Sequence, residues 1–189
     1  MTSFDSELHE THPKTRAGWR SWLQENHAKH DGVWLICYRA STGNRQLSWE
    51  DAVREALCFG WIDSKVKPID DERYKQIFTP RKPQSVWSKI NKQYIDELIE
   101  AELITDAGSG AVDIAKTNGA WSLLEPVDAL IAPAELESAL RKSKRAREAY
   151  EALSKSDKRS VLYSLYSAKG EDTRARRLAK ALATLEDRE

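Results

Sequence analysis

The sequence predicts an α+β protein in which a small antiparallel sheet of at least three strands packs on helices, followed by a C-terminal helical region. Three segments of the first half have the length and the apolar pattern of strands, whereas the apolar residues after Pro133 recur at helical spacing. The chain of 189 residues is 40% hydrophobic and 32% charged, which is a globular composition. We therefore expect an arm over residues 1–15, an α+β domain over 16–125, and a helical region over 126–189 packed on it.

Strands are expected in three segments. Val33–Tyr38 is a continuous apolar run rich in β-branched and aromatic residues, which favours a buried strand. Trp61–Ile69 and Arg73–Thr79 alternate between apolar and polar residues on either side of a polar turn, as the strands of an antiparallel hairpin do. Ile62 and Val66 would share one face of the first of these two strands.

Helices are expected in the remaining segments. Ser48 precedes an acidic first turn and is the expected N-cap of a helix that ends at Gly60. Ser85 is the expected N-cap of the longest helix of the first half, which would end near Leu103. Further helices are predicted over Ala17–His27, over Asp106–Lys116, from Pro133 onward, and over Ser143–Leu153, Ser156–Ala168 and Thr173–Leu185.

Composition and motifs exclude several functional classes. Lys and Arg together number 30, as do Asp and Glu, and no apolar run approaches the length of a membrane span. The first residues lack the pattern of a secretory signal, and Cys37 and Cys58 form no disulfide framework. The sequence has no nucleotide-binding loop, no nucleophile elbow and no zinc-protease motif. We expect a cytoplasmic protein without a cofactor or a metal.

The densest group of polar residues follows the predicted hairpin. Arg81 and Lys82 lie between two prolines and just before the predicted cap, Ser85, of a long helix. A helix N-terminus presents free N–H groups and partial positive charge, so it would add to these cations in binding an anion. The candidate ligand-binding residues are Trp61, Asp63, Lys65, Arg81, Lys82, Ser85, Ser88 and Asn91. Trp61 would offer a stacking face, and the expected partner is a small anionic ligand or another protein.

Three alternatives stay open. The basic residues of this loop could instead pair with the acidic segment 93–140, which carries ten acidic side chains and one basic. Asp63 with Lys65 or Arg81 could form the cleft of an enzyme, which requires an enclosed pocket around Asp63. Basic residues interleaved with aromatic ones also occur in nucleic-acid-binding proteins, but an isoelectric point near 6.9 does not favour that function.

Several strings of residues resemble the bacteriocin-protection family, also called the YdeI/OmpD-associated family. They are Phe59-Gly60-Trp61-Ile62-Asp63-Ser64, then Phe78-Thr79-Pro80-Arg81-Lys82-Pro83 with Trp87-Ser88-Lys89, and the C-terminal Ser167-Ala168-Lys169 with Thr173-Arg174. The resemblance covers about Trp19 to Leu185. It implies a bacterial stress or defence protein that protects against bacteriocins or antimicrobial peptides, a family associated by name with an outer-membrane porin. It implies no catalytic residues.

Overall fold

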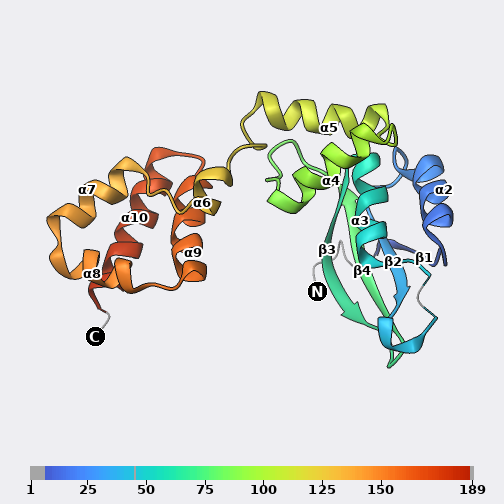
Figure 1. Cartoon of the computed structure of the whole chain (residues 1–189), viewed down its shortest axis with the longest axis horizontal. Coiled ribbons are helices and arrows are strands. Elements are labelled where there is room, and N and C mark those ends of the chain that lie inside the picture. The colour runs from blue at the N-terminus through green and yellow to red at the C-terminus, as the bar shows by residue number, and fades with distance from the viewer. Residues whose placement is uncertain (1–6, 45, 188–189) are drawn as a thin grey trace. The chain divides into compact units, whose positions relative to one another are not determined.

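The chain folds into two compact units, Met1–Ala120 and Trp121–Glu189. The structure is a computed structural model that describes residues 7–44 and 46–187. The first unit contains a sheet packed on helices, and the described part of the second is helical (Figure 1). The predicted α+β class is therefore confirmed, including the C-terminal helices.

The first unit is built on a four-stranded sheet in the order β1-β2-β4-β3. The strands are β1 (His9–Thr11), β2 (Val33–Tyr38), β3 (Trp61–Pro68) and β4 (Arg73–Pro80). Antiparallel pairing joins β2 to β4 and β4 to β3, so the three predicted strands lie side by side. The hairpin places Trp61 opposite Pro80, which brings the start of one strand next to the end of the other.

The strand β1 was not expected from the sequence. It lies within the segment for which an arm is predicted, and it pairs in parallel with β2, with His9 opposite Val33. The sheet is therefore mixed rather than wholly antiparallel. Three polar residues are too short a run for periodicity to reveal a strand.

The prediction that Ile62 and Val66 share one face of β3 is wrong. The register shifts between Asp63 and Val66, so two residues of β3 lie outside the regular ladder. A bulge of this kind reverses the face on which the following residues lie. Val66, which is 55% exposed, consequently lies opposite Gln76, on the other face from Ile62, which lies opposite Thr79.

Among the described residues, four helices accompany the sheet: α2 (Arg16–Asn26), α3 (Trp49–Cys58), α4 (Lys89–Glu100) and α5 (Asp106–Thr117). A 3₁₀ turn, η1 (Ala40–Thr42), precedes α3. As expected, the Ser48 hydroxyl caps α3 by accepting from the Asp51 N–H. Figure 1 shows α3 against the sheet, and α3 contacts α2, α4, α5 and β3. The core between these elements is filled by Trp19, Leu23, Val33, Leu35, Val53, Leu57 and Phe78.

The start of α4 differs from the prediction. This helix begins at Lys89, and its N-cap is Ser88, whose hydroxyl accepts from the Asn91 N–H. Ser85 instead accepts a hydrogen bond from the Lys82 N–H and closes a turn in the preceding loop. The prolines and this turn delay the helix, and Trp87 is buried in front of it. No helix N-terminus therefore stands directly after Arg81 and Lys82.

A buried carboxylate joins α2 to α3. Glu55 is 2% exposed and accepts from Arg16 at 2.6 Å and from Arg20 at 2.7 Å. Arg20 also donates to the Leu103 carbonyl at 2.8 Å, at the end of the segment that follows α4. Two guanidinium groups thus compensate one buried charge, and the network fixes three segments that are far apart in the sequence.

The second unit consists of α6 (Glu125–Asp128), α7 (Ala134–Lys142), α8 (Lys144–Ala152), α9 (Lys155–Tyr166) and α10 (Glu171–Glu186). Its core is a separate cluster of apolar side chains, including Val127, Leu136, Leu140, Leu153, Leu162, Leu165 and Leu185. Ser143 and Ser154 cap α8 and α9. Within residues 7–44 and 46–187, no helix is both long and apolar enough to cross a bilayer.

Candidate ligand-binding site

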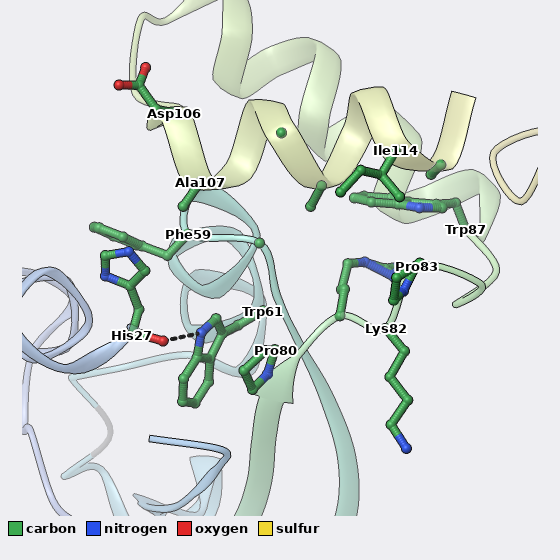
Figure 2. Close-up of a pocket in the computed structure, with 15 residues that line it drawn as sticks. His27, Phe59, Trp61, Pro80, Lys82, Pro83, Trp87, Asp106, Ala107 and Ile114 are labelled. Atoms are coloured by element: carbon green, nitrogen blue, oxygen red, sulfur yellow. Dashed lines mark hydrogen bonds between the residues drawn. The ribbon is translucent and has the colours of Figure 1, made fainter. Parts of the chain in front are cut away.

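A pocket of about 340 Å³ lies in the first unit, where the β3–β4 hairpin meets α5. Figure 2 shows α5 along one side and Trp61 and Pro80 along the other. The lining residues come from four segments that are distant in the sequence: the end of α2, the turn from α3 into β3, the loop after β4, and α5. They include His27, Phe59, Gly60, Trp61, Pro80, Arg81, Lys82, Pro83, Trp87, Asp106, Ala107, Gly110, Ala111 and Ile114.

The α5 side of the pocket depends on two glycines that permit close packing. Gly60 has φ of +71°, and a Cβ there would lie 2.9 Å from the Ala107 carbonyl oxygen. A Cβ on Gly108 would lie 2.4 Å from the Cys58 carbonyl oxygen. That oxygen also accepts from the Thr105 hydroxyl at 2.7 Å, just before α5 begins. Glycine is therefore required at both positions, because the helix approaches the end of α3 at backbone contact distance.

The opposite side of the pocket is aromatic. Trp61 is 1% exposed, and its indole N–H donates to the His27 carbonyl at 3.2 Å. The His27 ring in turn lies 5.1 Å from the Phe59 ring, centre to centre. Because the Trp61 ring is almost wholly buried and its indole donor is already engaged, Trp61 closes this side of the pocket and offers it no hydrogen-bonding group.

Arg81 supplies a half-buried positive charge to this pocket. Its guanidinium carbon lies 3.5 Å from the centre of the Trp87 ring. The terminal nitrogens donate to the Val86 carbonyl at 3.3 and 3.5 Å, which are long hydrogen bonds. Within residues 7–44 and 46–187 the Nε atom is buried and has no hydrogen-bond partner. Burial lowers the pKa of Arg81 to about 10, opposed by the attraction of Asp63.

The charge of Arg81 is not neutralised by direct contact. Over the described part of the chain, no carboxylate lies within ion-pair distance of this guanidinium, although Asp63 acts on it through space. Such a buried cation is costly unless a partner compensates it. The arrangement is therefore suited to an anionic group that enters from the pocket, where Arg81 already lines the wall.

Two more charged residues line the pocket but do not point into it. Figure 2 shows the Lys82 side chain extending away from α5, and the Asp106 carboxylate directed away from Trp61. Lys82 also lines a second pocket of about 500 Å³, together with Lys65, Ser64 and Thr79. The strands bring Lys65 to that second pocket, and it is not part of the first.

Asp63 has a structural role that the sequence did not reveal. One of its carboxylate oxygens accepts from the Trp49 indole N–H at 3.1 Å and from the buried Gln76 amide at 2.6 Å. These bonds join β3 to β4 and to the first turn of α3. Asp63 is half-buried and lines neither of the two pockets described above.

Of the eight residues predicted for the site, three line the pocket: Trp61, Arg81 and Lys82. Ser85 closes the turn beside Lys82, Ser88 caps α4, and the Asn91 backbone N–H is the donor to that cap. His27, Phe59, Gly110 and the other residues of α5 are not predicted from the sequence. The available signal was the pair of glycines in a predicted helix. Gly108 and Gly110 lower helix propensity, so their presence indicates that close packing requires a glycine in this helix.

The comparisons with known proteins give the family. Residues 129–188 match the family model described as bacteriocin-protection, YdeI or OmpD-associated. Residues 11–111, just over half of the chain, match a second model described as a domain of unknown function (DUF8412). The chain belongs to the DUF8412 family and carries a bacteriocin-protection, YdeI or OmpD-associated domain. No curated protein and no solved structure matches it.

The resemblance predicted from the sequence is thus confirmed by the C-terminal match. The YdeI/OmpD-associated domain coincides with the second structural unit, from the end of α6 to the end of α10. The strings around Trp61 and Arg81, which also carried the resemblance, lie within residues 11–111 and so within the DUF8412 match. The pocket at Arg81 therefore belongs mostly to the DUF8412 domain, whose match ends within α5.

Proposed function

We propose that this chain is a non-catalytic bacterial defence protein that protects against bacteriocins or antimicrobial peptides, and that its first unit binds a small anionic ligand in the pocket at Arg81. The family description of the C-terminal domain supports the protective role. The binding role rests on one observation, the half-buried Arg81 guanidinium that lies over the Trp87 ring without a carboxylate in contact.

An anionic ligand would relieve the free-energy cost of the uncompensated Arg81 charge. The planar guanidinium offers N–H groups in a fixed fork that matches a carboxylate or a phosphate. Stacking on Trp87 fixes the orientation of the fork before a ligand arrives, which reduces the entropy lost on binding. An anion bound beside the guanidinium would form charge-assisted hydrogen bonds in a partly dehydrated place, where they are stronger than in water.

The binding role is tested by isothermal titration calorimetry and thermal unfolding with small carboxylates, phosphorylated metabolites and nucleotides. We expect at least one anion to stabilise the wild-type protein, by about 2.7 kcal/mol when its concentration is 100 times its dissociation constant. Arg81→Met keeps an unbranched apolar stem and removes the guanidinium charge, so binding should fall below detection. Arg147→Met on exposed α8 is the matched control and should bind as the wild type does.

The protective role is tested in cells. A strain that lacks the protein should be more sensitive to bacteriocins or cationic antimicrobial peptides, and the wild-type chain should restore survival. Arg81→Met, expressed to the same level, should restore less than the wild type. Equal sensitivity with and without the protein would contradict the protective role, and full rescue by Arg81→Met would separate that role from the pocket.

A further inference from the structure

The second pocket, of about 500 Å³, lies on the face of the sheet that points away from α3. Ile77 closes its base and follows Gln76 in β4. The Gln76 amide donates to Asp63, which also accepts from the first residue of α3, so Gln76 is on the α3 face. Successive residues of a strand point to opposite faces, which places Ile77 on the other one. Among the described lining residues, the two pockets share Pro80 and Lys82 alone.

The bulge in β3 brings Ser64 and Lys65 to this second pocket. The register shifts between Asp63 and Val66, so the two residues lie outside the regular ladder, and both line the pocket. Bulges commonly redirect side chains beside functional sites. Lys65 has another interaction in the chain, but an ammonium group has three donors, so it can also bind a ligand oxygen. The irregularity thus adds one hydroxyl and one ammonium group to the pocket.

Thr79 and Lys82 supply the same two groups from β4 and the loop that follows it. Thr79 comes two positions after Ile77, so both side chains lie on one face of the strand. Figure 2 shows the Lys82 side chain extending away from α5, and therefore away from the first pocket. Two ammonium groups and two hydroxyl groups thus line one pocket. Together they suit a group that accepts hydrogen bonds through several oxygens.

The sheet face beside the second pocket is also positively charged. Lys67 lies directly opposite Lys75, and their ammonium nitrogens lie 5.1 and 4.9 Å from the centre of the Trp34 ring. Trp34 is the register partner of Ile77, so these two lysines are on the pocket side of the sheet. Glu10 pairs with Lys75 and compensates one of the two charges. The other charge raises the positive potential that an anion meets at the pocket.

The charges of the lining select a doubly charged ligand. Asp31 also lines the second pocket, and its carboxylate repels an anion, so both ammonium groups are needed for net attraction. A phosphomonoester carries about 1.5 to 2 negative charges at neutral pH and has three acceptor oxygens. We infer that the second pocket binds a small phosphomonoester, with its phosphate between the two lysines and accepting from the two hydroxyl groups. This site is separate from the one proposed at Arg81.

The test is an NMR titration of the ¹⁵N-labelled full chain, with affinities taken from the backbone N–H signal of Ser64. Methyl phosphate and glycerol 3-phosphate are the monoester probes, whereas dimethyl phosphate and acetate carry a single charge. We expect both monoesters to bind at least tenfold more tightly than either single-charged anion, and at least as tightly as inorganic phosphate. Vesicles that contain phosphatidic acid present the same group at a membrane, and binding to them without binding to glycerol 3-phosphate would overturn the inference.

The pH supplies a second readout from the same signal. The second pKa of a phosphomonoester is about 6, so the dianion predominates at pH 7.5 and the monoanion at pH 5. Lysine stays protonated at both values. The affinity for methyl phosphate should therefore fall about fivefold at pH 5, whereas that for dimethyl phosphate should not change.

Substitutions of the lining residues locate the phosphate. Lys65→Met and Lys82→Met should each weaken methyl phosphate at least fivefold. Lys169→Met removes an exposed lysine of the second unit and should bind as the wild type does. Asp31→Asn removes the repelling charge and should tighten binding at least twofold, a gain that a damaged fold would not produce.

The outcomes separate this site from the one at Arg81. Saturable shifts of Ser64 that favour monoesters and weaken in both lysine variants support the inference. The absence of such shifts, equal affinity for methyl and dimethyl phosphate, or binding that neither lysine variant alters overturns it. An anion whose binding Arg81→Met abolishes belongs to the first pocket, whereas binding at the second pocket survives that substitution. Either site can therefore fail while the other stands.

Discussion

Arg81 lies flat over Trp87, with 3.5 Å between the guanidinium carbon and the ring centre. Six positions separate the two residues, and the loop that joins them contains Pro83 and the turn closed by Ser85. The loop is tied to the sheet at its start, because the Arg81 N–H donates to the Gly60 carbonyl at 2.8 Å. The charged group is thus held in a pocket wall by an aromatic ring rather than by an acid.

This arrangement predicts that Arg81→Met stabilises the protein. Burial lowers the pKa of Arg81 to about 10, which corresponds to a cost of roughly 3 kcal/mol at neutral pH. The cation–π contact with Trp87 offsets up to about 2 kcal/mol of it. Methionine retains the apolar contact without the charge, so the free energy of unfolding should rise by about 1 kcal/mol in urea titrations. A loss of stability would mean that Arg81 has a structural role instead.

The same charge predicts a pH dependence. A base whose pKa is lowered on folding destabilises the folded state while both states are protonated, and the penalty disappears as the pH rises above the folded value. The free energy of unfolding of Arg81→Met should therefore exceed that of the wild type by the full amount at pH 8. At pH 11 this difference should be smaller by about 1 kcal/mol. Urea unfolding of both proteins at the two pH values measures this difference. Arg147→Met, measured in parallel, should show no such change with pH. A difference between Arg81→Met and the wild type that stays constant with pH would contradict the partly buried charge of Arg81.

The two glycines of α5 should respond oppositely to alanine. At Gly110 a Cβ meets nothing, so Gly110→Ala should raise the free energy of unfolding by about 1 kcal/mol through helix propensity. At Gly108 a Cβ would lie 2.4 Å from the Cys58 carbonyl oxygen, so Gly108→Ala should lower it by about 2 kcal/mol. Thermal unfolding of the two variants provides the check. Similar effects at both positions would show that α5 does not approach the end of α3 as closely as described.

The corrected start of α4 also predicts a contrast. Ser88→Ala removes the hydroxyl that caps the helix and should cost about 1 kcal/mol. Ser85→Ala removes the acceptor of one exposed backbone hydrogen bond and should cost less than about 0.5 kcal/mol. The pair can be compared by chemical unfolding at neutral pH. The reverse order would restore Ser85 as the cap.

Local chemistry was sufficient to predict most of the fold. The run Val33–Tyr38 forms a strand with the bounds that its apolar residues indicate, because a continuous β-branched and aromatic run flanked by a glycine has few other solutions. Ser48 caps α3, since a serine followed by two acids satisfies both the free N–H groups and the helix dipole. The C-terminal helices likewise follow from apolar spacing alone.

The failures share a physical cause, which is that tertiary contacts decided between local alternatives. Ser85 and Ser88 are both suitable caps, and the burial of Trp87 selects the second. The bulge begins at Asp63, which is bonded to Gln76 and Trp49, neither of which is near it in sequence. The strand β1 exists because β2 offers it an edge.

Only one side of the pocket could be predicted from the sequence. Arg81 and Trp61 stand out by residue type, and the hairpin that joins them is local. The opposite wall depends on a contact that is distant in the sequence, because α5 must pack beside the hairpin. Gly60 and Gly108 are the residues whose type indicates that contact. An isolated glycine in a helical pattern is ambiguous until its neighbour is known.

The most direct test of the account is an NMR titration of protein labelled with ¹⁵N-arginine. The Nε–Hε signal of Arg81, assigned by its absence in Arg81→Met, reports on the nitrogen that lacks a partner. We predict that benzoate or phosphate shifts this signal downfield to a saturating value, while the signal of Arg147 stays in place. An Arg81 signal that does not move at saturating concentrations of either anion would contradict the proposed site.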